Sequence, residues 1–201
     1  MTTDFTGLDV DPAATGAVVF DSKGRSRYQG TELVLRKAFS HSFEMLASYT
    51  RSKVEGDTAE EFGFENRQDA RSLDFTRLRY DRPDILNLSV FWRLPGDFDL
   101  TVIERYQSGA LYSPTIRSGT RIVIDPAQGK NSRRQPPLRS LDLSLSRSFS
   151  MGRGQLRITG QVFNLLNNLN VTTVETYDSS AGQPVAVDFG RMFQVGVEVR
   201  F

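Results

Sequence analysis

Apolar and polar side chains alternate along the last ten residues of the chain, "MFQVGVEVRF". Successive side chains of a β-strand point to opposite sides, so this segment has one apolar and one polar face. The apolar face carries Phe193, Val195, Val197, Val199 and Phe201. Such a strand needs an apolar medium on one side and polar surroundings on the other.

Six other segments alternate in the same way: "GTELVLRKAF", "FEMLASYTRS", "ILNLSVFWRLP", "FDLTVIERYQSG", "LRSLDLSLSRSF" and "QLRITGQVFN". A shorter candidate is "TGAVVF". Nowhere do apolar residues recur at i, i+3, i+4 and i+7 over several turns, as an amphipathic helix requires. The pattern predicts an all-β fold of about eight antiparallel strands.

The connections between these segments are of two kinds. "SHS", "PGD" and "SMGRG" are short and rich in turn-forming residues, and the first connection, "DSKG", is also short. The long connections span Glu55–Arg79, Ala110–Pro137 and Leu166–Pro184. Tight turns at one end and long loops at the other are typical of outer-membrane β-barrels. A soluble β-sandwich or a lipocalin-like barrel is the alternative at this point.

Composition narrows the function classes. A chain of 201 residues is long enough for one domain, and its net charge of +1 does not call for a nucleic-acid partner. The absence of cysteine excludes disulfides and thiolate metal sites. No stretch is long enough for a membrane helix, and the N-terminal sequence does not look like an export signal. Transmembrane β-strands remain compatible with this polar average composition.

In a membrane barrel, each alternating segment has a lipid-facing and a lumen-facing side. We expect the apolar positions to face lipid: Leu86, Leu88, Val90, Trp92, Leu141, Leu143, Leu145, Leu156, Ile158 and Val162. We expect the polar positions to face the lumen and to hydrogen-bond neighbouring strands or a plug: Asn87, Ser89, Arg93, Arg105, Asp142, Arg157 and Gln161. Aromatic residues near the strand ends are candidates for the interfacial girdles: Tyr49, Tyr80, Trp92 and Tyr106.

Five stretches, in order, resemble the C-terminal barrel of TonB-dependent outer-membrane receptors. They are "RYQGTELVLRKAFSHSFEMLASYTRSK", "YDRPDILNLSVFWRLPG", "YQSGALYSP", "QVFNLLNNLN" and the last strand ending in phenylalanine. Together they are spread across about residues 26–201. Two positions depart from the family pattern: Asp84 stands where the family often has histidine, and Leu111 where it often has proline. An Oar-like subtype, with a carboxypeptidase-regulatory type of plug, is one option within this resemblance.

The resemblance implies a barrel of about 22 strands, filled by an N-terminal plug and energised through the TonB complex. We therefore expect residues 1–201 to be the C-terminal portion of such a barrel, without plug or signal peptide. The parent would import a scarce ligand, such as an iron chelate, a cofactor or an oligosaccharide. Expected partners are outer-membrane lipid, lipopolysaccharide, the TonB complex and the barrel-assembly machinery, which would read the terminal strand. A self-standing eight-stranded barrel and a soluble β-sandwich binding module are the alternatives.

Other candidate sites have plainer interpretations. Carboxylates between Glu55 and Asp69 could bind calcium, but their spacing matches no EF-hand loop, which favours a solvated loop. Lys130, Arg133 and Arg134 could meet phosphates, although an exposed loop is the simpler account. His41 is the only histidine and lies in an expected turn, so we expect neither an enzyme nor a metal or cofactor site. "GRG" at 152–154 reads as a hairpin turn.

Overall fold

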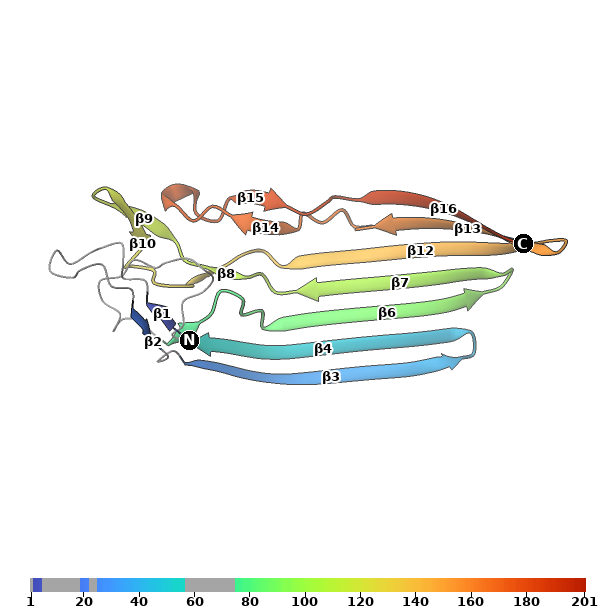
Figure 1. Cartoon of the computed structure of the whole chain (residues 1–201), viewed down its shortest axis with the longest axis horizontal. Coiled ribbons are helices and arrows are strands. Elements are labelled where there is room, and N and C mark those ends of the chain that lie inside the picture. Colours follow the sequence, from blue (N-terminus) through green and yellow to red (C-terminus); the bar gives the residue numbers. More distant parts are fainter. Residues whose placement is uncertain (1, 5–18, 22–24, 57–74) are drawn as a thin grey trace.

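The computed structural model describes residues 2–4, 19–21, 25–56 and 75–201. Among these residues, seven long strands form one antiparallel sheet in the order β16-β13-β12-β7-β6-β4-β3 (Figure 1). Their bounds are β3 Ser26–Ser40, β4 Phe43–Gly56, β6 Asp84–Leu94, β7 Phe98–Gln107, β12 Leu138–Met151, β13 Gly154–Phe163 and β16 Met192–Arg200. Each long strand pairs with the next one along the chain, so the sheet is an up-and-down meander. A two-residue strand, β5 (Thr76–Arg77), pairs with the end of β4.

Seven of the predicted strands are confirmed in this sheet, and the all-β prediction with them. The stretch "TGAVVF" is different, because only its last two residues lie in a described strand, β2 (Val19–Asp21). This strand pairs with β1 (Thr2–Asp4) in a separate two-stranded sheet, and residues 15–18 lie outside the described residues. The described residues contain no helix that is long and apolar enough to cross a membrane.

The connections "SHS", "PGD" and "SMGRG" lie at one end of the sheet (Figure 1). Of the fourth short connection, "DSKG", residues 22–24 lie outside the described residues. The backbone has positive φ at His41 (51°) and Ser42 (64°) between β3 and β4, and at Gly96 (81°) and Asp97 (61°) between β6 and β7. Gly152 (61°) turns the chain between β12 and β13. Positive φ in loops of two or three residues matches the twist of antiparallel strands, which is why these hairpins are tight.

The long connections gather at the opposite end, where they form what we call the loop-end cap, residues 75–83, 108–137 and 164–191 (Figure 1). The sequence predicts only loops there, yet the cap contains short strands. They are β8 Leu111–Tyr112, β9 Thr115–Ser118, β10 Arg121–Ile124, β11 Arg133–Arg134, β14 Val171–Val174 and β15 Pro184–Val187, with the 3-10 turn η2 at Asp178–Ser180.

Burial is confined almost entirely to the cap. Among the described residues, the buried apolar side chains are Leu78, Leu111, Tyr112, Val171 and Val174, and all five belong to it. The large apolar side chains of the sheet are exposed or half-buried, and those of the last strand are exposed. The other described sheets are small two-stranded ones, so no second layer covers the apolar side of the main sheet. A soluble β-sandwich would require such a layer, since two inner faces must pack together to form its core.

Candidate functional site

The strand register keeps apolar side chains on one side across all seven long strands. Directly paired residues of antiparallel strands point to the same side. One such row contains Met45, Val90, Val102, Leu143, Val162 and Phe193. All ten residues predicted to face lipid lie on this side, here called the apolar face. All seven residues predicted to face the lumen lie on the other, the polar face.

The apolar band crosses the strands at an angle. On β3 it comprises Leu33 and Leu35, whereas on β16 it runs from Phe193 to Val199, and pairing through the intervening strands places these residues at different levels. The band shifts by about six residues, roughly 20 Å along a strand, between β3 and β16. These two strands are six interstrand spacings apart, each of about 4.8 Å. This corresponds to a strand inclination of roughly 35°, the range that closed barrels require.

Aromatic residues lie at both ends of this band. Tyr49 and Tyr106 share the row nearest the cap, both paired with Leu86. Phe43 and Trp92 pair at the turn end, with ring centroids 6.4 Å apart in an edge-to-face arrangement. About 20 Å of strand separates Tyr49 from Phe43, as expected for two aromatic girdles. Tyr80, the fourth girdle candidate, instead lies exposed in the cap.

Charged residues on the apolar face lie toward its margins. Near the cap, Arg139 pairs with Glu104 at 3.1 Å. At the turn end, the Lys37 ammonium donates to the backbone carbonyls of Ser40 and Phe43, each at 2.9 Å. Long basic side chains can lie along an apolar surface while their charged ends reach polar groups. The apolar band is thus framed by groups suited to lipid headgroups.

The polar face carries a ladder of charges across β6, β7, β12 and β13. The Asp99 carboxylate pairs with Arg93 at 3.3 Å and with Arg157 at 3.1 Å. Arg157 also donates to the hydroxyl of Ser146 at 2.6 Å. Arg105 pairs with Asp142 one strand away. Cross-strand pairs of this kind satisfy the charges that the predicted lumen face brings together.

A groove of about 350 Å³ opens on this polar face, close to the cap. Its floor includes the Arg105–Asp142 pair and the side chains of Asn87 and Asn164, and Phe163 adds an apolar wall. Hydrogen-bonding groups of both kinds beside an aromatic ring can hold a polar ligand or a segment of another protein.

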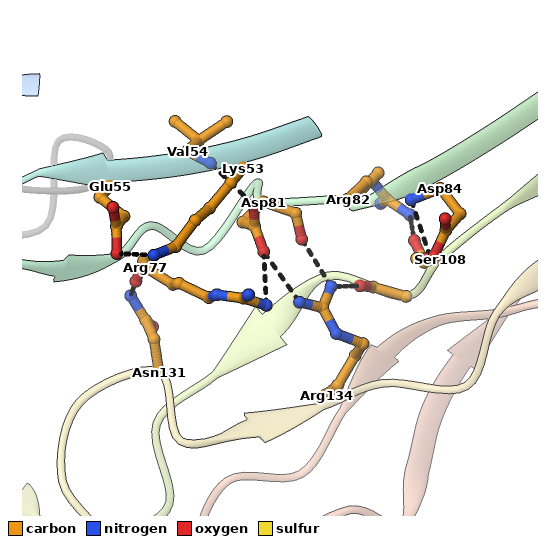
Figure 2. Close-up of polar contacts among 11 residues, drawn as sticks. Lys53, Val54, Glu55, Arg77, Asp81, Arg82, Asp84, Ser108, Asn131 and Arg134 are labelled. Carbon is orange, nitrogen blue, oxygen red and sulfur yellow. Dashed lines mark hydrogen bonds and ion pairs between the residues drawn. The ribbon is translucent and has the colours of Figure 1, made fainter. Parts of the chain in front are cut away.

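A buried carboxylate ties the cap to the sheet (Figure 2). Asp81 has no exposed surface and accepts a hydrogen bond from the backbone N–H of Val54 in β4 at 2.8 Å. Arg134 in β11 donates to the Asp81 carboxylate at 2.9 Å and to its backbone carbonyl at 2.6 Å. Arg77 adds an ion pair at 3.5 Å. These three side chains, called here the Asp81 clamp, join segments more than 50 residues apart.

The clamp explains two of the sequence motifs. Asp81 comes from "YDRPD", and Arg134 also donates to the carbonyl of Gly109 in "YQSGALYSP" at 2.6 Å. A Cβ atom at Gly109 would collide with the backbone carbonyl of Gln135, so only glycine fits there. Arg82 donates to the carbonyl of Ser108 at 2.9 Å, and burial, together with the neighbouring Arg134, lowers the pKa of Arg82 from its ordinary value.

The asparagine-rich motif "QVFNLLNNLN" forms a second joint between sheet and cap. Asn164 is buried and has a φ of 49°, a conformation that asparagine tolerates better than most residues. Its backbone N–H donates to Asp142 at 2.8 Å and its amide donates to the carbonyl of Asn168 at 3.0 Å. Asn170 bonds the backbone of Arg139 in both directions, at 2.8 and 3.0 Å. The motif therefore fixes the cap ends of β12 and β13.

The remaining sequence candidates have mixed outcomes. The expectation of an exposed loop is wrong for Arg134, whose side chain is 27% exposed and held in the clamp; Arg133 is exposed. Most of the acidic loop lies at residues 57–74, outside the described residues, while Glu55 pairs with Lys53. In the described part of the chain, no three His, Cys, Asp or Glu side chains gather as a metal site. His41 is exposed in its turn.

Comparisons with known proteins give a family match and a structural match. The family model described as "Outer membrane beta barrel domain" matches residues 8–126. A search of curated proteins finds no significant match. Among solved structures, the chain is similar to the closed form of the ferric-catecholate import receptor Fiu from E. coli K12, with a TM-score of 0.57 and 15% identity. The match covers 88% of this chain and 21% of the receptor.

The likeness to Fiu concerns the fold, and the chain spans about a fifth of that receptor's length. The family match covers more than half of the 201 residues. It agrees with the antiparallel meander, the single apolar face and the tight turns at one end. The chain therefore belongs to the outer membrane beta barrel domain family, and its location is the outer membrane of a Gram-negative bacterium.

Proposed function

We propose that this chain is the C-terminal portion of the barrel of a TonB-dependent receptor that imports a scarce ligand across the outer membrane. An iron chelate, a cofactor or an oligosaccharide would be such a ligand, and an Oar-like plug is one form of the missing part. The observation that carries the proposal is the open sheet, whose two edge strands, β3 and β16, pair with no further strand among the described residues.

Strand parity favours a barrel that contains further strands. The described sheet has seven long strands, an odd number, so β3 and β16 run in the same direction. An all-antiparallel barrel needs an even number of strands, as bacterial outer-membrane barrels have. Seven strands therefore have to be completed by an odd number of others. A receptor barrel of about 22 strands meets this condition.

Parity also permits a self-standing eight-stranded barrel, but the described residues do not supply the one further strand that it needs. The eighth predicted strand, "TGAVVF", supplies only a short strand outside the main sheet in the described part of the chain. The strands β3 and β16 form opposite edges of the sheet, with five strands between them (Figure 1). We therefore favour a portion of a larger barrel.

In this proposal the apolar face contacts lipid, and the cap lies outside the cell near lipopolysaccharide. The strand β16 is read by the assembly machinery through Phe193 to Phe201. TonB engages a part of the protein beyond these residues. The role is transport and not catalysis, and it involves no nucleic acid.

Cell fractionation with an immunoblot tests the proposal, using an antibody against residues 55–74. We expect a heat-modifiable band in the outer membrane, several times heavier than 22.6 kDa. A heat-modifiable band near 22.6 kDa would support the small barrel instead, and a soluble band would contradict both. If the heavy band is found, deletion of the gene for this protein should abolish uptake of a ligand. That uptake should also require an energised inner membrane.

A further inference from the structure

Two basic residues lie on the apolar face toward the tight turns, Lys37 in β3 and Arg147 in β12. The pairing row of Lys37 crosses β12 at Leu143, four residues before Arg147. The two strands are four interstrand spacings apart, and the apolar band shifts by about one residue per spacing. Both cations therefore lie at the same margin of the inclined band.

The charges at the two margins of the apolar face are paired differently. Every carboxylate on this face of the seven described strands lies toward the cap and forms an ion pair: Glu55 with Lys53, Asp84 with Arg51, and Glu104 with Arg139. Arg27 is a further cation at that end. At the turn end, Lys37 donates to the carbonyl and hydroxyl of Ser40 and to the carbonyl of Phe43, each at 2.9 Å, so its three N–H groups are used.

Arg147 has no such polar partner in the described part of the chain. Its guanidinium lies over the rings of Phe98 and Phe149, at 4.8 and 4.9 Å from their centroids. Phe98 is the residue of β7 that pairs directly with Arg147, and Phe149 is the next residue on the same side of β12. Arg147 is exposed, and among the described residues its guanidinium forms no hydrogen bond or ion pair. The two rings thus position the guanidinium and leave its N–H groups unoccupied.

The acidic residues of the neighbouring strand and turn do not serve Arg147. Asp99 lies on the polar face, where its carboxylate pairs with two arginines of that face. Asp97 lies in the exposed turn between β6 and β7 and forms no ion pair with Arg147. The turn between β12 and β13 adds a further cation, Arg153. An anion that binds the donors of Arg147 therefore has to come from outside the described chain.

The free donors and their surroundings suit a phosphate that carries acyl chains. A guanidinium has five N–H groups in a planar fork that binds phosphate oxygens bidentately, and it stacks on aromatic rings while doing so. One row closer to the middle of the band, Leu100 pairs with Leu145 and adds an apolar surface for such chains. The short turns of outer-membrane barrels face the periplasm. The headgroups at this margin are therefore those of phospholipids in the periplasmic leaflet.

We propose that Arg147, with Phe98 and Phe149, is a binding site for the phosphate group of a glycerophospholipid in the periplasmic leaflet. The acyl chains of this lipid lie along Leu100 and Leu145. The inference rests on the part of the proposed function in which the apolar face contacts lipid, and it requires neither a particular imported ligand nor a larger barrel.

Photolabelling of the complete protein, purified from outer membranes in a maltoside detergent, tests the proposal. One probe is phosphatidylglycerol with a diazirine in an acyl chain, and the other is diacylglycerol with the same chains, which lacks the phosphate. Arg147→Gln removes the guanidinium, and Arg147→Lys keeps the charge without the fork. Arg139→Gln is the matched control, because Arg139 lies on the same face of the same strand but pairs with Glu104. Each variant is first located by cell fractionation, and labelled peptides are identified by mass spectrometry.

We expect the phosphatidylglycerol probe to label residues 98–100 and 145–149 of the unchanged protein and of Arg139→Gln more strongly than the diacylglycerol probe does. Arg147→Gln should lower this yield several-fold, and Arg147→Lys should lower it less. An unchanged yield with Arg147→Gln, or equal labelling by the two probes, would overturn the phosphate site.

Two competitors separate the sources of phosphate. We expect unlabelled phosphatidylglycerol to displace the probe and soluble glycerol 3-phosphate to leave it bound. Displacement by glycerol 3-phosphate would show a site for a soluble anion, and stronger displacement by lipopolysaccharide than by phosphatidylglycerol would contradict the periplasmic leaflet. Absence of the unchanged protein and of every variant from the outer membrane would instead refute the proposed function.

Discussion

The loop-end cap and the sheet differ in where their apolar side chains lie: the cap buries some of its own, whereas the described sheet buries none. The cap contains all the buried apolar residues among those described, and it closes around a carboxylate with no exposed surface. The sheet has exposed apolar side chains along one face, and its edges β3 and β16 pair with no further strand in the described part of the chain. The cap is therefore stabilised by its own contacts, whereas we propose that the sheet depends on lipid and on further strands. Changes in the two regions should have separable effects.

The largest expected effect is on the cap alone. Asp81→Ala removes the acceptor that holds Arg134 and the N–H of Val54, and removing one partner of a buried ion pair costs about 3–5 kcal/mol. We expect faster hydrogen exchange and proteolysis in residues 108–137, with normal membrane assembly. Asp97→Ala, in an exposed turn, is the control. Equal protection in both variants would show that the clamp does not hold the cap.

A charge on the apolar face should damage the sheet and spare the cap. Leu143→Arg introduces a cation near the middle of the apolar band, at a cost of about 2–4 kcal/mol if this face meets lipid. The neighbouring variant Ser144→Arg places the same side chain on the polar face. We expect lower outer-membrane levels and a lower urea midpoint only for Leu143→Arg. The reverse order would mean that the faces have been assigned the wrong way round.

A change in the asparagine-rich motif, which joins the sheet to the cap, should have an effect of intermediate size. Asn164→Ala removes the side-chain hydrogen bonds to the carbonyl and N–H of Asn168, at 3.0 and 2.9 Å. Asn164 is buried, and leaving a buried polar group without its partner costs about 1–3 kcal/mol. We expect residues 164–191 to exchange faster while the clamp region stays protected. The exposed Asn167→Ala is a weaker comparison variant. Loosening of the whole cap would show that the two joints act as one unit.

The smallest effect should come from the charge ladder. Arg93→Ala removes an exposed ion pair with Asp99, and exposed pairs contribute at most about 1 kcal/mol. We expect a barely changed urea midpoint for the assembled protein. A loss as large as that of Leu143→Arg would show that Arg93 is covered by a partner in the assembled barrel.

Much of the sheet could be predicted from the sequence because a period of two is a local signal. Seven strands and three hairpin turns followed from alternation and turn residues. The β-bulge between Lys37 and Ser40, which contains Phe39, could not be predicted, since the strand ends at Ser40 and too few residues follow to reveal a change of phase in the alternation. The clamp was missed because Asp81 and Arg134 are far apart in the sequence. Charge alone made Arg134 look like an ordinary loop residue.

The asparagine motif shows the opposite case. Its resemblance to a family element was evident from the sequence, but the physical reason was not. Asn164 and Asn167 occupy positive φ, at 49° and 54°, and their side chains bond nearby backbone groups. The bond from the Arg191 N–H to the Asn167 side chain, at 3.0 Å, joins the motif to the segment before β16, which only the folded chain brings beside it.

We infer that one face of the sheet meets lipid and the other does not. This chain contains no cysteine, so spin labels on single cysteines can be placed in turn at residues 141–146 of β12 in the membrane-assembled protein. We predict high oxygen accessibility at Leu141, Leu143 and Leu145, and low values at Asp142, Ser144 and Ser146. A nickel chelate in the water phase should not reach the label at Leu143. Absence of the two-residue period, or access of the chelate to Leu143, would contradict the account.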